Sequence, residues 1–455
     1  MKAKRMNSSA VFTLRTRIVL GGACIFLALL LIVGACTLPF VFESPSILYK
    51  FGIHKTFLRS GKIFGVIAAA LVFFQVLLVS RLKILDRIFS LNRIYMFHRM
   101  NGMAIAGLAL MHPILVMAAE NITIFPFEIR YWPEFLGVGV LVFIVMLIII
   151  ANWRLMFGFA YDKWLRFHRL GTLLAIALLI VHILFVSETF TSGLPHALVF
   201  VIAVSTLLLI SRLWYRRFFP GNRRFVVTHV QRVGQDAYSV DVRPDGHRIL
   251  EYIPGQFAFI TPVSENLPKE EHPFTICSTP SRSDALQFVI RSQGDWTSKI
   301  NGIKVGEPVF IDGPYGLFSH MVSPGNDPII MIAGGIGITP MLSMLRYMTD
   351  IDDQRQILLI WSNKTKESIV FPEEFKNLEC VLPGLQIIHV ITRGGGGGYE
   401  KGRLDQTTLE RVLEGYSRNS NVFICGPFEM MKEMSRAVRK IGFFSTRIYK
   451  EEFRL

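Results

Sequence analysis

Phe97-His98-Arg99 precedes an uncharged run that ends at His112, and Phe167-His168-Arg169 precedes a similar run that ends at His182. In both segments the histidines are 14 residues apart, from 98 to 112 and from 168 to 182. On an α-helix this separation turns about 1,400°, roughly 40° short of four turns, so each pair lies on one face, roughly 21 Å apart along the axis. Two such helices side by side predict two metal centres, one above the other, each between two imidazoles.

The surrounding sequence is typical of a membrane protein. Hydrophobic residues make up 51% of the 455-residue chain, and they concentrate before about residue 215. Six charge-free windows are long enough to cross a bilayer: 18–42, 63–80, 100–119, 135–153, 170–187 and 189–211. Because an ionisable residue inside a membrane is costly, it indicates a functional site. We therefore expect His98, His112, His168 and His182 to ligate two stacked haems. Arg99 and Arg169 would meet the haem propionates or act only as topology determinants.

Lysine and arginine residues predict the orientation of the spans. They concentrate in the N-terminal segment, in the second and fourth loops and after the last span, which places these parts and the C-terminal half in the cytoplasm of a multi-pass plasma-membrane protein. The first outer loop, with Lys50, Lys55, Arg59 and Lys62, breaks this pattern. The net charge of +15 is explained by these flanking residues, so we expect no nucleic-acid partner.

The first span has an alternative interpretation. Basic residues before an apolar run also describe a signal peptide, and Val33-Gly34-Ala35-Cys36 is similar to a lipoprotein cleavage site. Cleavage there would leave five spans.

After residue 223, short alternating runs predict a small antiparallel β-barrel, at 224–230, 237–242, 256–261, 286–290 and 308–312. Three motifs lie within it: Pro254-Gly255-Gln256-Phe257, His272-Pro273-Phe274-Thr275-Ile276-Cys277-Ser278, and Arg291 followed by Gly294-Asp295-Trp296-Thr297. They resemble the flavin-binding motifs of the ferredoxin–NADP reductase-like superfamily. The His-Pro-Phe-Thr form resembles its membrane branch, the NADPH oxidases and ferric reductases.

This resemblance implies an FAD site. Four residues of the second motif would line the isoalloxazine: His272, Pro273, Phe274 and Thr275. Arg291 and Thr297 would approach the ribityl chain and the pyrophosphate. The soluble branch usually begins this motif with arginine instead of His272, which leaves open the group that neutralises the FAD phosphate. Without the resemblance, Phe274 reads as core and Thr297 as a helix cap.

From residue 328 the pattern changes to alternating strands and helices. An apolar run at 329–333 leads into Gly334-Gly335-Ile336-Gly337-Ile338-Thr339-Pro340, and a helical run at 341–347 follows. A strand, a glycine turn and a helix form the context of a phosphate-binding loop, because the backbone can approach the phosphate closely and the helix offers free N–H groups. Further runs at 356–361 and 385–392 predict an α/β unit with a parallel sheet.

The resemblance implies that this unit binds a pyridine nucleotide. The residues expected at the nucleotide are Gly335, Gly337, Thr339, Pro340, Gly426 and Pro427. Cys425 would lie near the nicotinamide C4, or be a buried strand-end thiol. Related proteins often end on an aromatic residue that stacks on the flavin, and Phe453 is the candidate, although two residues follow it. Positive charge near the adenosine ribose favours NADPH over NADH; the residues expected there are Ser362, Asn363, Lys364 and Arg403.

We therefore expect a membrane α-helical bundle of six spans (1–215), an antiparallel β-barrel that binds FAD (216–322) and an α/β domain that binds NAD(P)H (323–455). The resemblance implies electron transfer from cytoplasmic NAD(P)H through FAD and two b-type haems to an acceptor outside, with dioxygen favoured over a ferric chelate. Two alternatives remain: a subunit that donates electrons to a membrane partner, and a membrane-anchored flavoreductase without haem.

Overall fold

The computed structural model describes residues 12–43, 50–120, 128–154, 156–158, 161–186, 190, 193–218, 223–281, 284–322, 325–394 and 398–452. The chain divides into two compact units. The membrane unit comprises residues 19–82 and 93–219, and the soluble unit comprises residues 1–18, 83–92 and 220–455.

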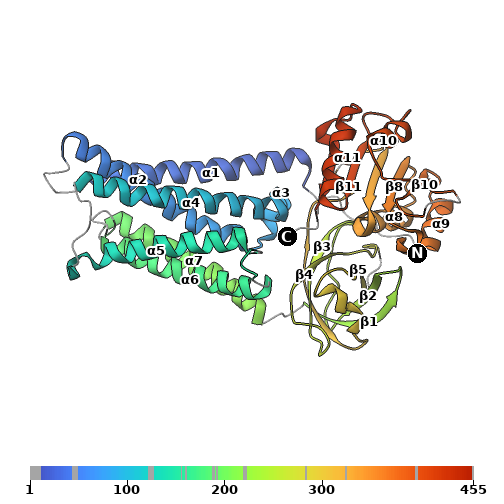
Figure 1. Cartoon of the computed structure of the whole chain (residues 1–455), viewed down its shortest axis with the longest axis horizontal. Helices are drawn as coiled ribbons and strands as arrows, with labels where there is room; N and C mark the ends of the chain where they lie inside the picture. The colour runs from blue at the N-terminus through green and yellow to red at the C-terminus, as the bar shows by residue number, and fades with distance from the viewer. Residues whose placement is uncertain are drawn as a thin grey trace. The chain divides into compact units, whose positions relative to one another are not determined.

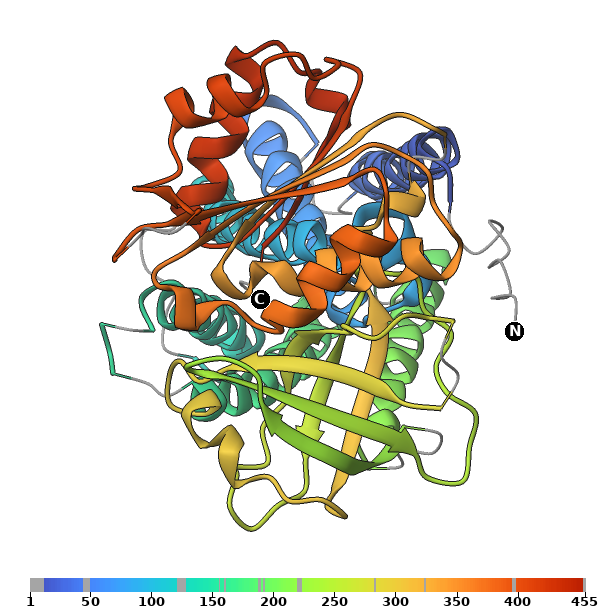
Figure 2. The ribbon, with the colours of Figure 1, turned by 90° about the vertical axis from the view of Figure 1, so that its right-hand side faces the viewer.

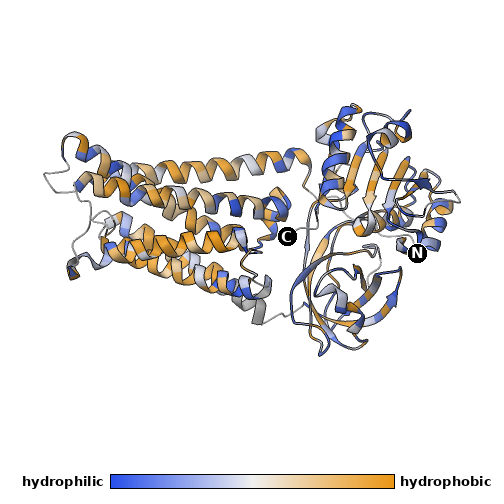
Figure 3. Ribbon diagram, in the orientation of Figure 1, coloured by the Kyte–Doolittle hydropathy of each residue, from blue (hydrophilic) through white to orange (hydrophobic). Residues whose placement is uncertain are grey.

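Six helices are long and apolar enough to cross a membrane, as predicted (Figures 1 and 3). They are α1 (Leu14–Val41), α2 (Gly52–Val79), α4 (Leu91–Glu120), α5 (Trp132–Trp153), α6 (Tyr161–Val186) and α7 (Gly193–Phe218). At most 17% of the most apolar stretch of each helix is buried inside the protein. Their side chains therefore present a broad apolar surface, which suits lipid and not water. A short helix, α3 (Lys83–Phe89), was not predicted and belongs to the soluble unit.

Helix α2 begins well before the charge-free window that starts at residue 63. Lys55 and Arg59 lie in its first turns, and both form ion pairs with Glu43. This pairing partly neutralises the basic residues of the first outer loop, which departed from the charge distribution that predicts the orientation.

The first half of the soluble unit is a six-stranded antiparallel sheet that curls on itself (Figure 2). Its strand order is β4-β3-β6-β1-β2-β5. The strands are β1 (Arg224–Arg232), β2 (Ala237–Pro244), β3 (Phe257–Pro262), β4 (His272–Thr275), β5 (Leu286–Arg291) and β6 (Pro308–Tyr315). Its core is apolar and includes Phe225, Ile260, Phe288 and Ile311. The curled sheet confirms the predicted fold, while β4 was recognised only as a motif.

The second half is a parallel sheet of order β10-β9-β8-β7-β11-β12. Its strands are β7 (Ile329–Gly334), β8 (Ile357–Asn363), β9 (Leu385–Ile391), β10 (Glu400–Lys401), β11 (Asn421–Cys425) and β12 (Ile448–Glu451). Its helices are α8 (Thr339–Asp350), α9 (Pro372–Val381), α10 (Gln406–Val412) and α11 (Phe428–Lys440). Alternate residues of β7 belong to different cores: Met331 packs with α8 and α9, and Ile332 packs with α10 and α11. Helices therefore cover both faces of the sheet.

Short 3-10 helices complete the fold. They are η3 (Ile129–Tyr131), η5 (Thr297–Gly302), η6 (His320–Val322), η7 (Gly335–Ile338), η8 (Lys366–Ser368) and η9 (Ser445–Arg447).

Candidate functional site

The inner histidines, His98 of α4 and His168 of α6, face each other in the membrane unit. Their ring centroids are 6.4 Å apart and their planes are inclined by 80°. A metal-bound imidazole nitrogen lies about 2 Å from the metal, so two rings on opposite sides of one iron have centroids on the order of 6 Å apart. Within the described part of the chain, Nδ1 of each ring is buried without a hydrogen-bond partner. The spacing fits a haem iron held between the two rings.

The outer histidines are oriented by backbone carbonyls. Nδ1 of His112 lies 2.8 Å from the carbonyl oxygen of Gly61, and Nδ1 of His182 lies 2.9 Å from that of Pro133. Because a carbonyl only accepts, Nδ1 carries the proton in each neutral ring and Nε2 keeps its lone pair. Metal-ligating histidines usually make this second bond. His112 and His182 therefore fit haem ligation as well.

Two glycines on neighbouring helices make room for the outer rings. A Cβ at Gly65 of α2 would lie 2.8 Å from Nδ1 of His112, and a Cβ at Gly137 of α5 would lie 2.7 Å from Nδ1 of His182. This role was not predicted, because these glycines lie on helices that carry none of the four histidines. Gly107, between the histidines of α4, has no contact of this kind.

The inner histidine of α6 is also packed by an aromatic residue that sequence reasoning missed. The Trp164 ring stacks on that of His168, with centroids 5.4 Å apart and planes inclined by 26°. Trp164 is four residues earlier on the same helix, so helical spacing is the signal that would have found it. Arg99, expected near a propionate, donates from Nε to Asn152 at 3.1 Å.

In the soluble unit, the predicted flavin-binding motif at β4 forms a cluster of aromatic rings. The His272 ring lies 4.3 Å from the Trp296 ring, and Phe274 stacks on Trp296 at 5.9 Å. Nε2 of His272 is 3.1 Å from a carboxylate oxygen of Glu270. His272 therefore has an acidic neighbour at the position where the soluble branch usually carries an arginine. Pro273 pairs with Phe259 of β3, and Thr275 is buried.

A glutamine joins the two glycine-containing turns of this sheet. The side chain of Gln256 accepts from the Ile253 amide and donates to the Gly316 carbonyl, both at 3.0 Å. The Pro254–Phe257 motif is thus held against the end of β6, at Gly316.

Arg291 and Thr297 have different surroundings. Nε of Arg291 donates to Asp236 at 3.1 Å, and a Cβ at Gly335 would lie 2.6 Å from Nη1 of Arg291. The guanidinium therefore lies against the glycine-rich loop. Thr297 begins η5, and its hydroxyl bonds to the backbone of Gln293.

The glycine-rich loop and the Cys425-Gly426-Pro427 turn lie side by side, because β7 pairs with β11. This is the point where the strand order reverses, and open α/β sheets bind ligands outside the carboxyl ends of such strands. A Cβ at Gly337 would lie 2.6 Å from the carbonyl carbon of Cys425, and one at Gly334 would lie 2.8 Å from Cδ of Pro427. Only glycines permit this approach.

The helix after the loop begins with Thr339 and Pro340, both of which are buried. Proline suits the first turn because it supplies no N–H there. The positive dipole end of α8 at this loop is suited to an anion such as a phosphate.

Cys425 is fully buried, and burial raises the pKa of its thiol well above the ordinary value, with a smaller contribution from Glu451. Burial therefore favours the neutral thiol, which suits packing against a nicotinamide. Glu451 of β12 is in register with Cys425. Sequence reasoning missed this carboxyl, whose position depends on strand pairing.

Burial, followed by the charge of Asp86, raises the pKa of Glu451 from 4.5 to about 8. Asp86 belongs to α3 in the same unit and accepts from the amides of Gly316 at 3.0 Å and Leu91 at 2.9 Å. Burial also raises the pKa of Asp86, to about 6.

The remaining predicted residues are only partly placed. Asn363 ends β8 and is buried, with neither side-chain polar atom bonded to another described residue. Ser362 precedes it in β8, and Lys364 follows it. Arg403 pairs with Glu433 at 2.8 Å. Phe453 lies outside the described residues.

Comparison with known families agrees with this arrangement. Residues 64–181 match the model of the ferric reductase like transmembrane component, residues 223–319 match an FAD-binding domain, and residues 331–436 match the oxidoreductase NAD-binding domain. The chain belongs to the ferric reductase and NADPH oxidase-like family. The ferric reductase-like chain thus combines a multi-pass transmembrane component with an FAD-binding domain and an oxidoreductase NAD-binding domain.

Curated relatives match the soluble half of this ferric reductase-like chain. The glycine betaine monooxygenase reductase subunit of Chromohalobacter salexigens is 27% identical over 40% of this chain and 50% of its own length. The NADH oxidoreductase HCR of Escherichia coli is 26% identical over 50% of this chain and 67% of its own length. The chain thus spans about half to two thirds of these relatives.

Solved structures of low similarity match the same half. The flavohem-like FAD/NAD-binding domain of a nitric oxide dioxygenase from Vibrio cholerae is 21% identical, with a TM-score of 0.46, over 51% of this chain and 98% of that chain. The cytochrome b5 reductase domain of Ulva prolifera nitrate reductase is 20% identical, with a TM-score of 0.44, over 50% of this chain and 96% of that chain.

Proposed function

We propose that the chain transfers electrons from cytoplasmic NAD(P)H through FAD and two stacked b-type haems to an acceptor outside the plasma membrane. The observation that carries this proposal is the pairing of histidines between α4 and α6. His98 and His168 have the separation that one iron requires, and His112 and His182 lie 14 residues farther along the same two helices, in the same direction.

The chain's own residues position the cofactors in this proposal. A flavin accepts two electrons as hydride and releases them singly, and a bound haem iron accepts one electron at a time. His98 and His168 would hold the inner haem, while the carbonyls of Gly61 and Pro133 orient His112 and His182 for the outer one. If two histidines held each haem, an acceptor would have no free coordination position on the iron and would react without binding to it.

Dioxygen is the acceptor that we favour. The outer segment 121–132 contains only Glu128 and Arg130 as charged residues, and no motif in it marks a site for a ferric chelate. Dioxygen requires no charged site. Ferric-chelate reduction and electron donation to a membrane protein are the alternatives.

The experiment that tests the route replaces the outer ligands. We expect His112→Leu and His182→Leu each to abolish the NAD(P)H-driven reduction of external acceptors, while NAD(P)H reduces the flavin at the wild-type rate. His54→Leu is the matched control, because His54 also bonds through Nδ1 to a backbone carbonyl, that of Ala119 at 2.7 Å, but has no histidine partner in the proposal. Stopped-flow absorbance measures the flavin step.

Two outcomes would contradict the route: slow flavin reduction in both ligand variants, or unchanged reduction of external acceptors in them. Acceptor choice is measured on the wild type, by comparing superoxide dismutase-sensitive cytochrome c reduction with ferric-chelate reduction. A chain with little turnover on both acceptors would instead be an electron-donating subunit.

A further inference from the structure

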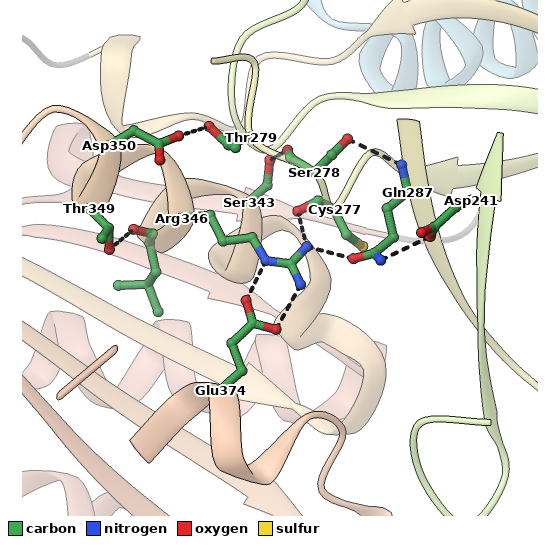
Figure 4. A network of polar contacts seen from close by, with 11 residues as sticks. Asp241, Cys277, Ser278, Thr279, Gln287, Ser343, Arg346, Thr349, Asp350 and Glu374 are labelled. Atoms are coloured by element: carbon green, nitrogen blue, oxygen red, sulfur yellow. Dashed lines mark hydrogen bonds and ion pairs between the residues drawn. The ribbon is translucent and has the colours of Figure 1, made fainter. Parts of the chain in front are cut away.

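Helix α8 contacts the segment that follows the flavin motif. Ser343, Arg346 and Asp350 are three and four residues apart, so they lie on one face of the helix. Figure 4 shows these side chains against the backbone of residues 277–279. The Ser343 hydroxyl donates to the Ser278 carbonyl at 2.9 Å, and Asp350 accepts from the Thr279 hydroxyl.

Arg346 makes the central contacts of this face. Its Nη1 donates to the carbonyl oxygen of Cys277 at 2.8 Å and to Oε1 of Gln287, on β5, at 2.6 Å. Its Nε and Nη2 donate to the two carboxylate oxygens of Glu374, on α9, at 2.6 and 2.8 Å. One guanidinium therefore bonds to the flavin sheet and to the nucleotide-binding half at once.

The network extends into the flavin sheet. The side-chain Nε2 of Gln287 donates to Asp241 of β2 at 2.9 Å, and the backbone N–H of Gln287 donates to the Ser278 hydroxyl at 3.2 Å. The side chains of Arg346 and Glu374 are 16% and 30% exposed. A largely buried ion pair carries a desolvation cost that only well-formed hydrogen bonds offset, so such a pair is weak support for stability alone. The fork geometry of arginine instead fixes its partners in place.

We propose that Arg346 is a positioning residue for hydride transfer. This inference rests on the proposed function, in which Arg346 connects a segment that binds the flavin with a helix that begins at the nucleotide. The α8 helix begins at the loop expected to hold the nucleotide pyrophosphate, and Cys277 follows the segment 272–275 expected to line the isoalloxazine. By bonding to both segments, Arg346 fixes the position of the nucleotide loop relative to the flavin segment. It thereby sets how closely the nicotinamide approaches the flavin. In this step the C–H bond at nicotinamide C4 would break, the hydride would carry both electrons of that bond to the flavin, and NAD(P)H would become NAD(P)⁺.

The reaction is sensitive to such positioning, because a displacement of about 1 Å at reacting atoms can lower a rate by about 100-fold. We expect Arg346→Met to lower the rate of flavin reduction at saturating NAD(P)H by about 10- to 100-fold, with nucleotide affinity within about threefold of wild type. Arg346→Lys keeps the charge but not the fork, so its rate should be intermediate. A larger primary isotope effect with 4-deuterated nucleotide should accompany the slower step.

The test uses the purified full-length chain with FAD, by stopped-flow absorbance, together with FAD content and thermal unfolding. Arg355→Met is the matched control. Arg355 is also buried, pairs with Asp353 at 2.9 and 3.0 Å, and bonds to the Gly325 carbonyl, all within the nucleotide-binding half. Its loss should lower the unfolding temperature and leave the hydride rate unchanged.

Wild-type hydride transfer in an FAD-loaded Arg346→Met chain would overturn the inference, and so would an equal loss in Arg355→Met. If Arg346→Met does not retain FAD, the same comparison is made with Arg346→Lys, where a wild-type rate and isotope effect overturn it. A wild-type flavin that neither NADH nor NADPH reduces would instead overturn the proposed function.

Discussion

At the residue scale, the proposed outer haem site depends on the glycines beside the histidines as much as on the histidines themselves. Gly137 lets α5 approach the His182 ring, and Pro133, one turn earlier on the same helix, supplies the carbonyl that orients it. The histidine spacing was readable from the sequence because both members of a pair share one helix. The contacts between glycines and histidine rings could not be predicted from the sequence, because each contact joins residues on different helices.

Gly137→Ala should therefore displace the His182 ring and weaken or remove the outer haem. Gly139→Ala is the control, since it lies on the same helix and a Cβ there meets no atom within 4 Å. Haem content and low-spin haem absorbance, measured for both purified variants, check this expectation. Equal spectra in the two variants would show that the close approach of Gly137 is not needed.

At the element scale, most helices and strands follow from periodicity and apolar length. The exceptions have physical reasons. The four-residue strand β4 is too short to show an alternating pattern, and α2 is longer than its charge-free window because Glu43 pairs with its first basic residues. The neighbours of Cys425 depend on the order of parallel strands, so the sequence could indicate the thiol but not Glu451 of β12.

The pairing of β11 and β12 predicts a pH dependence of stability. The folded chain raises the pKa of Glu451 from 4.5 to about 8, so between these values the folded state holds a proton that the unfolded state has lost. Stability should therefore fall as the pH rises through this window. Glu451→Gln, which is neutral throughout, should flatten the fall.

The measurement is the thermal unfolding temperature of the full-length chain between pH 6.5 and 8.5, a window on the order of two pH units around the shifted carboxyl. Asp86, with a pKa raised to about 6, contributes mainly below this range. Equal slopes for the wild type and Glu451→Gln would contradict the assignment.

At the scale of the whole molecule, the sequence indicates both units and the order of the cofactors along the chain. The family matches cover both parts, with the membrane component at 64–181 and the two reductase domains after residue 222. The contact between the flavin sheet and α8 was not predicted, because Arg346 finds its partners in three separate segments, at Cys277, Gln287 and Glu374. Gln287 in turn donates to Asp241 in a fourth segment.

The central claim is that four histidines hold two haems, and the ratio of haem to FAD in the purified chain tests it most directly. After expression with sufficient haem, pyridine haemochrome and flavin absorbance should give two b-type haems per FAD in the wild type. The ratio should fall to one in His112→Leu and His182→Leu, and stay at two in His54→Leu. One haem or none in the wild type, or an unchanged ratio in the outer-ligand variants, would contradict the account.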